Sequence, residues 1–450
     1  MASTYLTETT LGTATDATKF TYSAWVKRSS IPAGGSNDYE LLMGSRPSHV
    51  DGHGGVWLWL NGEFAFYDYP SSGGSALTTR TSAKLRDVNA WYHLVVVGDA
   101  SQSGTDKLKF YINGELQTAF DEDNRSSFAT IAHSIHDTNY PVQIGGRDYS
   151  VHYYFSGIMS HVHFTDGYAY AASTFGSTDS TTGQWKINTS PSVTYGNNGF
   201  FILKDGSSVT DQSGNSNNFT VGGGTLTKSE DSPSNVFATL NPLVRVAGNI
   251  TYSSGNTKIA RSGTAEWRTC YSTLAMTTGK YYFEALSDAG ANNVIGIREL
   301  QNADGSTAGS GNDYPGYTSQ GWSLYNQNGT VYNNNVTSGS AIGTFTDGDY
   351  IGVFLDCDNQ KLYFSKNGTM LNTTGYSISS VPYVFGVALY DDGGGFSCNF
   401  GNGTFGSTQL TGTTYNGSDG NGIFKYDPNN ITLDGSSKSF KSLSTKGLNS

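Results

Sequence analysis

The sequence predicts an all-β protein built as two β-sandwiches in tandem. Its composition has 57 glycines, 29 tyrosines and only 14% charged residues, which fits many short strands joined by tight turns. Apolar segments alternate with polar residues at the period of a strand, and almost no stretch has convincing helical periodicity. A strand–turn–strand pattern also occurs twice, far apart in the 450 residues. Two copies at this separation predict two sandwiches, each with such a hairpin in its core.

The repeated hairpin combines an apolar strand that ends in Asp with an alternating strand that ends in Asn-Gly. The first copy comprises Trp91–Asp99 and Lys107–Leu116, and the second comprises Tyr350–Asp356 and Lys361–Met370. In each copy one face of the second strand is apolar and the other is polar. This is the period-2 pattern of a half-buried strand.

Each copy ends in an Asn-Gly pair, at Asn113-Gly114 and Asn367-Gly368. A type I′ turn needs positive φ at two successive residues, and Asn-Gly is the pair that accepts this most readily. We therefore expect a tight turn at both positions.

The remaining strands follow the same patterns. In the first half we expect strands at residues 20–27, 41–43, 56–60, 63–69, 142–147 and 155–164. In the second half we expect them at 278–284, 294–297, 321–325, 383–387 and 396–401. Gly222–Gly224, Pro233 and Pro242 interrupt the pattern and place the boundary at about residue 243. The predicted divisions are a first sandwich with its connecting segment at 1–242, a second sandwich at 243–408 and a polar tail at 409–450.

Charge and composition exclude several classes of function. The net charge is −11 and the 26 basic residues are scattered, whereas a nucleic-acid surface needs them clustered. No apolar run approaches the ~18 residues of a membrane helix, and the first residues lack the features of a signal peptide. We therefore expect no nucleic-acid partner, no membrane insertion, and assembly in a cytoplasm. Cys270, Cys357 and Cys398 are widely spaced, which predicts buried thiols rather than disulfides or a zinc site.

Several segments of the first half resemble a laminin-G-like, concanavalin-A-like jelly roll. They are Trp25–Ser29, Trp91–Val96, Lys109–Gly114, Ile144–Arg147 and Phe155–Phe164. The segments that follow resemble a family of tail-fibre-like virion proteins from marine bacteriophages, most distinctively at Asp231–Pro242. This second resemblance extends over nearly the whole chain.

The second half resembles a SPRY domain, which is also a two-sheet sandwich. The matching segments are Thr278–Glu284, Val294–Ile297, Gly321–Tyr325, Gly348–Asp356, Lys361–Gly368 and Tyr383–Val387. Together the resemblances imply a virion protein that is oligomeric and contacts other virion proteins.

No catalytic residue is predicted. Concanavalin-like glucanases carry a Glu-x-Asp-x-x-Glu strand motif whose carboxyl groups lie on either side of the sugar bond, and this chain has none. The nearest acidic cluster, Asp121–Asp123, falls in an expected loop and is interpreted as a solvated turn. Motifs for nucleophile elbows, metalloproteases and phosphate loops are also missing. His161 and His163 are two residues apart and could face one side of a strand, but no third ligand accompanies them.

Calcium is the one cofactor that the sequence allows. Laminin-G-like jelly rolls often hold calcium at a rim, and the ion prefers six to eight oxygen ligands. The candidate ligands are Asp205, Asp211, Asn215 and Asn217. The same residues also form a good turn without any ion, and both alternatives stay open.

A cluster of aromatic residues in the SPRY-like half is the predicted ligand-binding site. Aromatic rings stack on the apolar faces of sugars, and carboxylates and amides bind their hydroxyls. The candidate residues are Tyr314, Tyr317, Tyr325, Tyr332, Asp391 and Asp392. We expect Tyr314, Tyr317 and Tyr332 in exposed loops, and Trp322 in the core. The resulting hypothesis is a virion fibre or decoration component that binds a host surface glycan or protein. An architectural subunit and a glycan-degrading enzyme are the alternatives.

Overall fold

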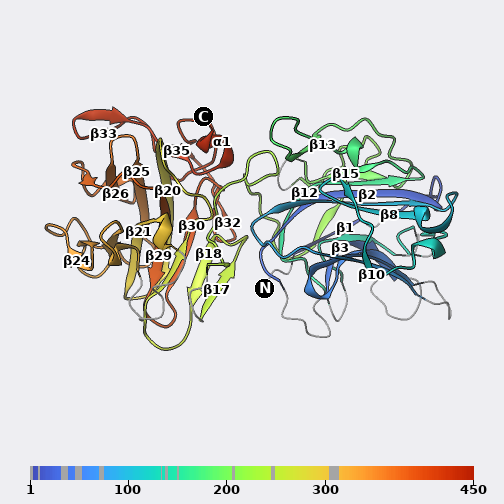
Figure 1. Cartoon of the computed structure of the whole chain (residues 1–450), viewed down its shortest axis with the longest axis horizontal. Helices are drawn as coiled ribbons and strands as arrows, with labels where there is room; N and C mark the ends of the chain where they lie inside the picture. The colour runs from blue at the N-terminus through green and yellow to red at the C-terminus, as the bar shows by residue number, and fades with distance from the viewer. Residues whose placement is uncertain are drawn as a thin grey trace. The chain divides into compact units, whose positions relative to one another are not determined.

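The computed structural model describes the chain except residues 1–3, 9–10, 32–38, 46–52, 70–75, 133, 137–139, 149–151, 205–207, 245–248, 304–313 and 450. The chain forms two compact units, Met1–Thr227 and Lys228–Ser450, and both are built from strands (Figure 1). The described residues contain one α-helix, α1 (Thr445–Leu448), and several single 3-10 turns. These turns are η1 (Leu60–Gly62), η2 (Gly104–Lys107), η3 (Arg125–Ser127), η4 (Ala172–Thr174), η5 (Leu300–Asn302) and η7 (Pro315–Tyr317). The predicted all-β class is confirmed.

Unit 1 is a sandwich of an eight-stranded and a six-stranded sheet. The larger sheet has the order β10-β6-β5-β4-β3-β11-β1-β16. Its strands are β1 (Tyr5–Glu8), β3 (Glu40–Ser45), β4 (His53–Leu58), β5 (Glu63–Tyr69), β6 (Leu77–Lys84), β10 (Phe120–Glu122), β11 (Val142–Ile144) and β16 (Thr220–Gly223). The smaller sheet has the order β15-β12-β2-β7-β8-β9. Its strands are β2 (Lys19–Arg28), β7 (Trp91–Asp99), β8 (Leu108–Ile112), β9 (Glu115–Leu116), β12 (Gly157–Asp166) and β15 (Phe200–Ile202).

The core of unit 1 lies between these two sheets. Alternate residues of β2, including Phe20, Tyr22 and Val26, pack there with Phe64 from the larger sheet. The intervening residues of β2 face away from this core. A separate hairpin, β13 (Gly176–Thr178) with β14 (Trp185–Ile187), packs on that second face.

Unit 2 is a second sandwich, with a nine-stranded and a six-stranded sheet. The larger sheet runs β17-β18-β30-β20-β25-β26-β27, and β28 and β35 join it at β26 and β20. Its strands are β17 (Ile250–Ser253), β18 (Lys258–Arg261), β20 (Lys280–Ala289), β25 (Tyr350–Asp356), β26 (Lys361–Lys366), β27 (Thr369–Met370), β28 (Tyr376–Ser377), β30 (Gly395–Asn399) and β35 (Lys441–Ser442). The smaller sheet runs β19-β29-β21-β22-β23-β24. Its strands are β19 (Arg268–Tyr271), β21 (Asn293–Glu299), β22 (Trp322–Tyr325), β23 (Val331–Asn333), β24 (Val336–Thr337) and β29 (Tyr383–Leu389). Two small hairpins complete the unit, β31 (Thr404–Phe405) with β32 (Thr408–Gln409) and β33 (Ile431–Leu433) with β34 (Ser436–Lys438).

The repeated hairpin has the same geometry in both units. Asn113 and Gly114 have φ values of 49° and 80°, and Asn367 and Gly368 have 49° and 80°, as a type I′ turn requires. Each Asn side chain also accepts a hydrogen bond from a backbone N–H at the start of the preceding strand. The distances are 2.8 Å from His93 to Asn113 and 2.9 Å from Tyr350 to Asn367. Both predicted turns are confirmed.

The structure places the division between the units earlier than the predicted residue 243. Residues 228–242 belong to unit 2, because Ala238 and Leu240 lie in its core. Phe237 pairs with Ser444, and Leu240 pairs with Ser272. Pro233 and Pro242 lie in irregular chain, whereas Gly222 and Gly223 lie in strand β16 of unit 1. Long-range pairing decides to which sandwich residues 228–242 belong.

The predicted tail at 409–450 is an integral part of unit 2 rather than a separate segment. Phe424, Leu433 and Phe440 are buried against Tyr282 and Phe354 on the outer side of the larger sheet. Strand β35 pairs in parallel with β20. The acidic side chain of Glu284, itself fully buried, accepts the backbone N–H groups of Lys425 and Tyr426 at 2.7 and 3.3 Å.

Across the described ranges, no helix has the length and apolar character needed to cross a membrane.

Candidate functional site

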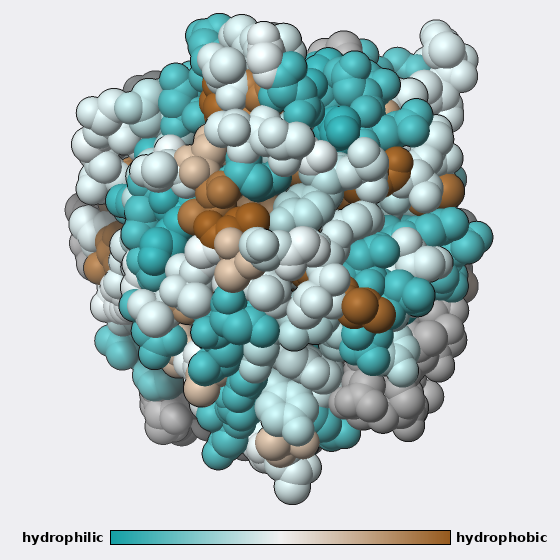
Figure 2. Space-filling model, turned by 90° about the vertical axis from the view of Figure 1, so that its left-hand side faces the viewer, coloured by the Kyte–Doolittle hydropathy of each residue, from teal (hydrophilic) through white to brown (hydrophobic). Residues whose placement is uncertain are grey.

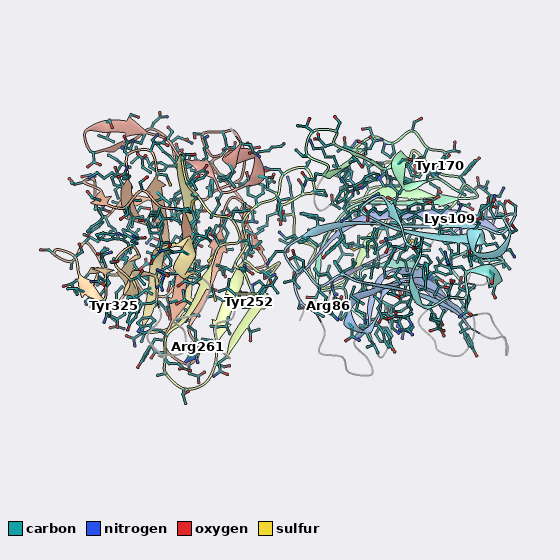
Figure 3. All side chains as sticks on the ribbon, in the orientation of Figure 1. Arg86, Lys109, Tyr170, Tyr252, Arg261 and Tyr325 are labelled. Atoms are coloured by element: carbon teal, nitrogen blue, oxygen red, sulfur yellow. The ribbon has the colours of Figure 1, made fainter. Side chains whose placement is uncertain are left out.

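Six aromatic residues form a patch on the outer face of the smaller sheet of unit 2. In β21, Ile295 and Ile297 point into the core, whereas Val294 points outward and packs in the patch. We call this patch the tyrosine face. Its members are Trp267, Tyr314, Tyr317, Tyr325, Tyr332 and Tyr390. Figure 3 labels Tyr325, at the edge of unit 2.

Tyr314 is the centre of the tyrosine face. Its ring centroid lies 5.3 Å from Trp267, 5.8 Å from Tyr317 and 6.1 Å from Tyr332. Tyr325 extends the contacts, at 6.1 Å from Trp267 and 6.0 Å from Tyr332. Most of these pairs are edge-to-face, the arrangement that aromatic quadrupoles favour. The rings therefore hold one another in fixed orientations.

Tyr314 itself is only 6% exposed, so the prediction that it lies in an exposed loop is wrong. Its hydroxyl donates to Asn335 Oδ1 at 2.6 Å, and its carbonyl accepts from the buried Arg298 at 3.0 Å. Burial raises the pKa of the Tyr314 phenol above its usual value, so the hydroxyl stays a donor. Tyr314 supports the other rings from below, while Tyr317 and Tyr332 remain partly exposed.

The predicted placement of Tyr332 in a loop is wrong, because Tyr332 is the middle residue of strand β23. Tyr325 is the last residue of β22, in agreement with the strand expected at residues 321–325. The short strands form despite the Asn-rich sequence because each pairs with a neighbour, β22 with β21 and β23 with β22. Trp322 is half-buried beside the core, close to the expected position.

Polar side chains border the tyrosine face on one side. Asn292 donates to Asp391 Oδ2 at 2.8 Å and accepts the hydroxyl of Tyr325. Asp392 is exposed and accepts the N–H of Gly263 at 3.0 Å. Asp391 is therefore joined to the tyrosine face through Asn292, whereas Asp392 caps a neighbouring turn.

Sequence reasoning missed Trp267 as a member of this site. Its ring contacts Tyr314, Tyr325 and Tyr390, which are 47 to 123 positions away. Its local sequence carries no strand pattern or motif that marks it. Tyr390 was adjacent to the predicted Asp391 and could have been included on that ground.

The surface chemistry of this end of unit 2 is mixed rather than strongly apolar. Figure 2 shows mostly pale and teal residues with small separate brown patches. A surface of rings bordered by amides and carboxylates suits ligands that have both apolar faces and hydroxyl or amide groups.

The proposed calcium ligands form a hydrogen-bonded turn instead. Asp211 Oδ1 accepts the N–H groups of Phe201 and Ser213 at 2.8 and 2.9 Å. Asp211 Oδ2 accepts the Ser213 hydroxyl at 2.7 Å and the Asn217 N–H at 3.0 Å. Four donors thus point at this carboxylate, where a cation would need vacant lone pairs.

The two asparagines give the same result. The amide nitrogens of Asn215 and Asn217 both donate to the carbonyl of Gly199, at 2.8 and 2.9 Å. These amides present N–H groups, not oxygens, to the centre of the turn. The calcium prediction is therefore replaced by its alternative, the turn; Asp205 lies outside the described residues.

His161 and His163 are part of packed aromatic contacts. His163 is 2% exposed, stacks on Phe201 with centroids 3.9 Å apart, and shares a hydrogen bond with Tyr195. Burial lowers the pKa of His163 well below its usual value, so the ring is neutral. Within the described part of the chain, no three His, Cys, Asp or Glu side chains come close enough to hold a metal ion.

The acidic segment Asp121–Asp123 lies partly in a strand, β10, and not in the expected loop. Its side chains are engaged in ion pairs: Glu122 with Arg80 at 3.2 Å and Asp123 with Arg125 at 2.8 Å. The pKa values of Asp121 and Asp123 are lowered, chiefly by hydrogen bonds from Ser82 and Arg125. Such carboxylates do not supply a proton at neutral pH, as a glycosidase acid must.

Comparison with known families agrees with the two-sandwich architecture. Residues 2–173 match the family described as the concanavalin A-like lectin/glucanases superfamily (Laminin_G_3), and residues 280–403 match the SPRY domain. The chain carries a concanavalin A-like domain followed by a SPRY domain. In the SPRY domain the tyrosine face includes strands β22 and β23 and the residue after β29.

Three solved structures resemble parts of the chain. They are the SPRY domain of human HERC1 (16% identity, 33% of this chain and 91% of that chain, TM-score 0.28), a human SPRY domain (18%, 34% and 94%, 0.27) and the TRIM65 PSpry domain (15%, 36% and 91%, 0.29). These TM-scores are low and we base no argument on them. The comparison with curated proteins gave no match.

Proposed function

We propose that the protein is a non-enzymatic recognition component of a bacteriophage virion, a fibre or decoration protein that binds a host surface glycan or protein. The virion role is supported by the sequence resemblance to tail-fibre-like proteins of marine phages. The binding role is supported by the tyrosine face. In this proposal the protein assembles in the host cytoplasm, is oligomeric, and contacts other virion proteins.

The observation that carries the binding role is the fixed and partly exposed set of aromatic rings on a sheet. Tyr314 orients its neighbours through ring contacts and through its bonds to Asn335 and Arg298. A recognition surface that is ordered before binding loses less conformational entropy when a ligand arrives. Aromatic residues of this kind are enriched where binding energy concentrates.

The architectural alternative rests on a different observation. The rings of the tyrosine face pack against one another, and the hydroxyls of Tyr314 and Tyr325 are hydrogen-bonded within the unit. Such a patch could simply pack against a neighbouring subunit. Both functions need the same surface, so the experiment has to separate binding to the host from assembly.

A variant of the outer rings tests the proposal. We expect Tyr317→Ala with Tyr332→Ala in the full chain to leave thermal unfolding almost unchanged, because both side chains are partly exposed. Binding of the purified chain to host cells should fall about tenfold or more, the loss typical of one or two aromatic contacts. A matched control is Tyr168→Ala with Tyr170→Ala, a partly exposed tyrosine pair of unit 1 with centroids 6.2 Å apart.

The outcomes distinguish the two functions. Loss of cell binding only in the first variant supports recognition by the tyrosine face. Unchanged cell binding together with loss of the protein from assembled particles, detected by mass spectrometry, supports the architectural alternative. Absence of the native protein from purified phage particles would refute the virion role.

A further inference from the structure

The C-terminal segment of unit 2 forms an open groove of about 530 Å³. The groove lies outside residues 280–403, the part that matches the SPRY domain. Its lining residues are Tyr415, Asn416, Gly417, Ser418, Gly420, Asp427, Asn429, Asn430 and Ser439. We propose that this groove is a binding site for one or two units of a neutral carbohydrate chain.

The groove has a rigid frame. Tyr415 and Phe424 exchange two backbone hydrogen bonds, of 2.9 and 2.7 Å, and Phe424 is fully buried. Asn429 Nδ2 donates to the carbonyl of Asn416, another lining residue, at 2.9 Å. Ser418 N–H donates to the carbonyl of the buried Phe440 at 2.9 Å. The lining residues are therefore bonded to one another and to Phe424 and Phe440 of the buried apolar cluster.

Several polar side chains of this frame remain available to a ligand. Among the hydrogen bonds of the described residues, none involves the Tyr415 hydroxyl, the Ser418 hydroxyl or the side-chain amide of Asn430. Asp427 uses Oδ1 for Asn429, and its Oδ2 takes part in no protein hydrogen bond. A carboxylate oxygen and an amide close together can bind adjacent sugar hydroxyls, since one accepts and the other both donates and accepts.

The aromatic ring completes the requirements of a sugar site. Tyr415 is 36% exposed, and among the described residues that line the groove it is the one aromatic side chain. Its ring can pack on the C–H face of a sugar while the amides and Asp427 take the hydroxyls. A site with one exposed ring among polar groups suits a ligand that has both apolar C–H faces and hydroxyl groups better than it suits a wholly apolar ligand.

The charges select against anionic ligands. The lining residues include Asp427 but no Lys, Arg or His. A sialic acid, a uronic acid or a phosphate would place its charge near this carboxylate, and none of the described lining residues supplies a compensating cation. The groove chemistry therefore points to neutral hexose units.

Binding of named sugars to the full chain tests this inference. The probes are maltotriose, cellotriose and galactosyl-lactose as neutral sugars, with sialyl-lactose as the anionic comparison, observed by saturation-transfer NMR. We expect at least one neutral sugar to bind with millimolar affinity and sialyl-lactose to bind at least tenfold more weakly. Tyr415→Ala should weaken the neutral sugar about tenfold, as loss of an aromatic contact does.

A second variant distinguishes a loss of sugar binding from a loss of folding. Asn430 has φ of 55°, so Asn430→Gly removes its amide while keeping a residue that accepts this conformation. This variant should also weaken binding severalfold at unchanged melting temperature. Tyr168→Ala with Tyr170→Ala, a partly exposed pair in unit 1 outside both proposed sites, should leave sugar binding at the native level. The groove variants test this inference, whereas cell binding by Tyr317→Ala with Tyr332→Ala tests the proposed function, so either can fail without the other.

Three results would overturn the inference. They are no binding of any neutral sugar, native affinity in both groove variants, and a preference for sialyl-lactose.

Discussion

Replacement of Gly114 by Ala should destabilise unit 1 strongly, because the turn is covered by a ring. A Cβ at this position would lie 2.4 and 2.5 Å from two carbons of the Trp185 ring, and φ is +80°. Trp185 cannot move without loss, since its indole N–H donates to Nδ1 of the fully buried His93 at 3.0 Å. The substitution therefore combines backbone strain with a broken buried hydrogen bond.

The free-energy costs of the backbone strain and of the broken hydrogen bond can each be estimated. A left-handed conformation costs a non-glycine residue about 1–2 kcal/mol. An unpaired buried acceptor costs about 1–3 kcal/mol. The free energy of unfolding of unit 1 should thus fall by about 2–5 kcal/mol. At about 2–4 °C per kcal/mol for a unit of this size, its melting temperature should fall by roughly 4–20 °C in differential scanning calorimetry.

Gly104 provides the matched control. It also has positive φ, +55°, and lies in the loop of the same hairpin, but a Cβ there meets nothing within 4 Å. Gly104→Ala should therefore show only the strain, about 1–2 kcal/mol. Equal losses in the two variants would refute the reasoning, because Trp185 would then impose no constraint on the turn.

Three further predictions concern pH, the C-terminal segment and calcium. Burial raises the pKa of Glu284 from 4.5 to about 7. Its contribution to the stability of unit 2 is therefore full below pH 4.5 and declines as the pH rises to about 7. Glu284→Gln should remove this part of the pH dependence of thermal unfolding. Phe440→Ala should lower the free energy of unfolding of unit 2 by about 3–5 kcal/mol in urea titration, because the ring is fully buried and 5.1 Å from Phe354. Asp211→Ala should destabilise unit 1 by about 2 kcal/mol or more through its four lost hydrogen bonds, whereas EDTA should leave the melting temperature unchanged.

Each of these predictions has a contradicting outcome. Identical pH profiles for the native chain and Glu284→Gln would show that another group titrates. Val336→Ala, at a side chain 61% exposed, is the control for Phe440→Ala and should cost less than about 0.5 kcal/mol; equal costs would mean that the C-terminal segment is not packed. A fall in melting temperature on adding EDTA would restore the calcium hypothesis.

The sequence predicted the features of this fold that depend on nearby residues. Strand alternation predicted the strand at residues 20–27, and Asn-Gly predicted both type I′ turns, because period and turn chemistry act over a few positions. It also grouped Tyr314, Tyr317, Tyr325 and Tyr332 correctly, since they are close in the chain.

The errors have a common physical cause, which is contact between distant segments. Tyr314 is buried because Trp267 and Asn335 approach it from other parts of the chain. Residues 228–242 join unit 2 because they pair near positions 272 and 444. The C-terminal groove was not predicted because Asn, Ser and Gly in sequence suggest only loops, and its walls come together through Phe424 and Phe440.

The ring that covers each Asn-Gly turn has a practical consequence for anyone who alters this chain. In both units the covering ring comes from a later segment, Trp185 over Gly114 and Tyr426 over Gly368, where a Cβ would lie 2.4 and 2.5 Å from ring carbons. Hairpin tips are the usual choice for epitope tags, dye attachment and peptide display, because they are assumed to project into solvent. Here an inserted peptide would displace the ring above it. The loop at Gly104 and the turns at Gly183 and Gly435, where a Cβ meets nothing within 4 Å, are the better sites for such additions.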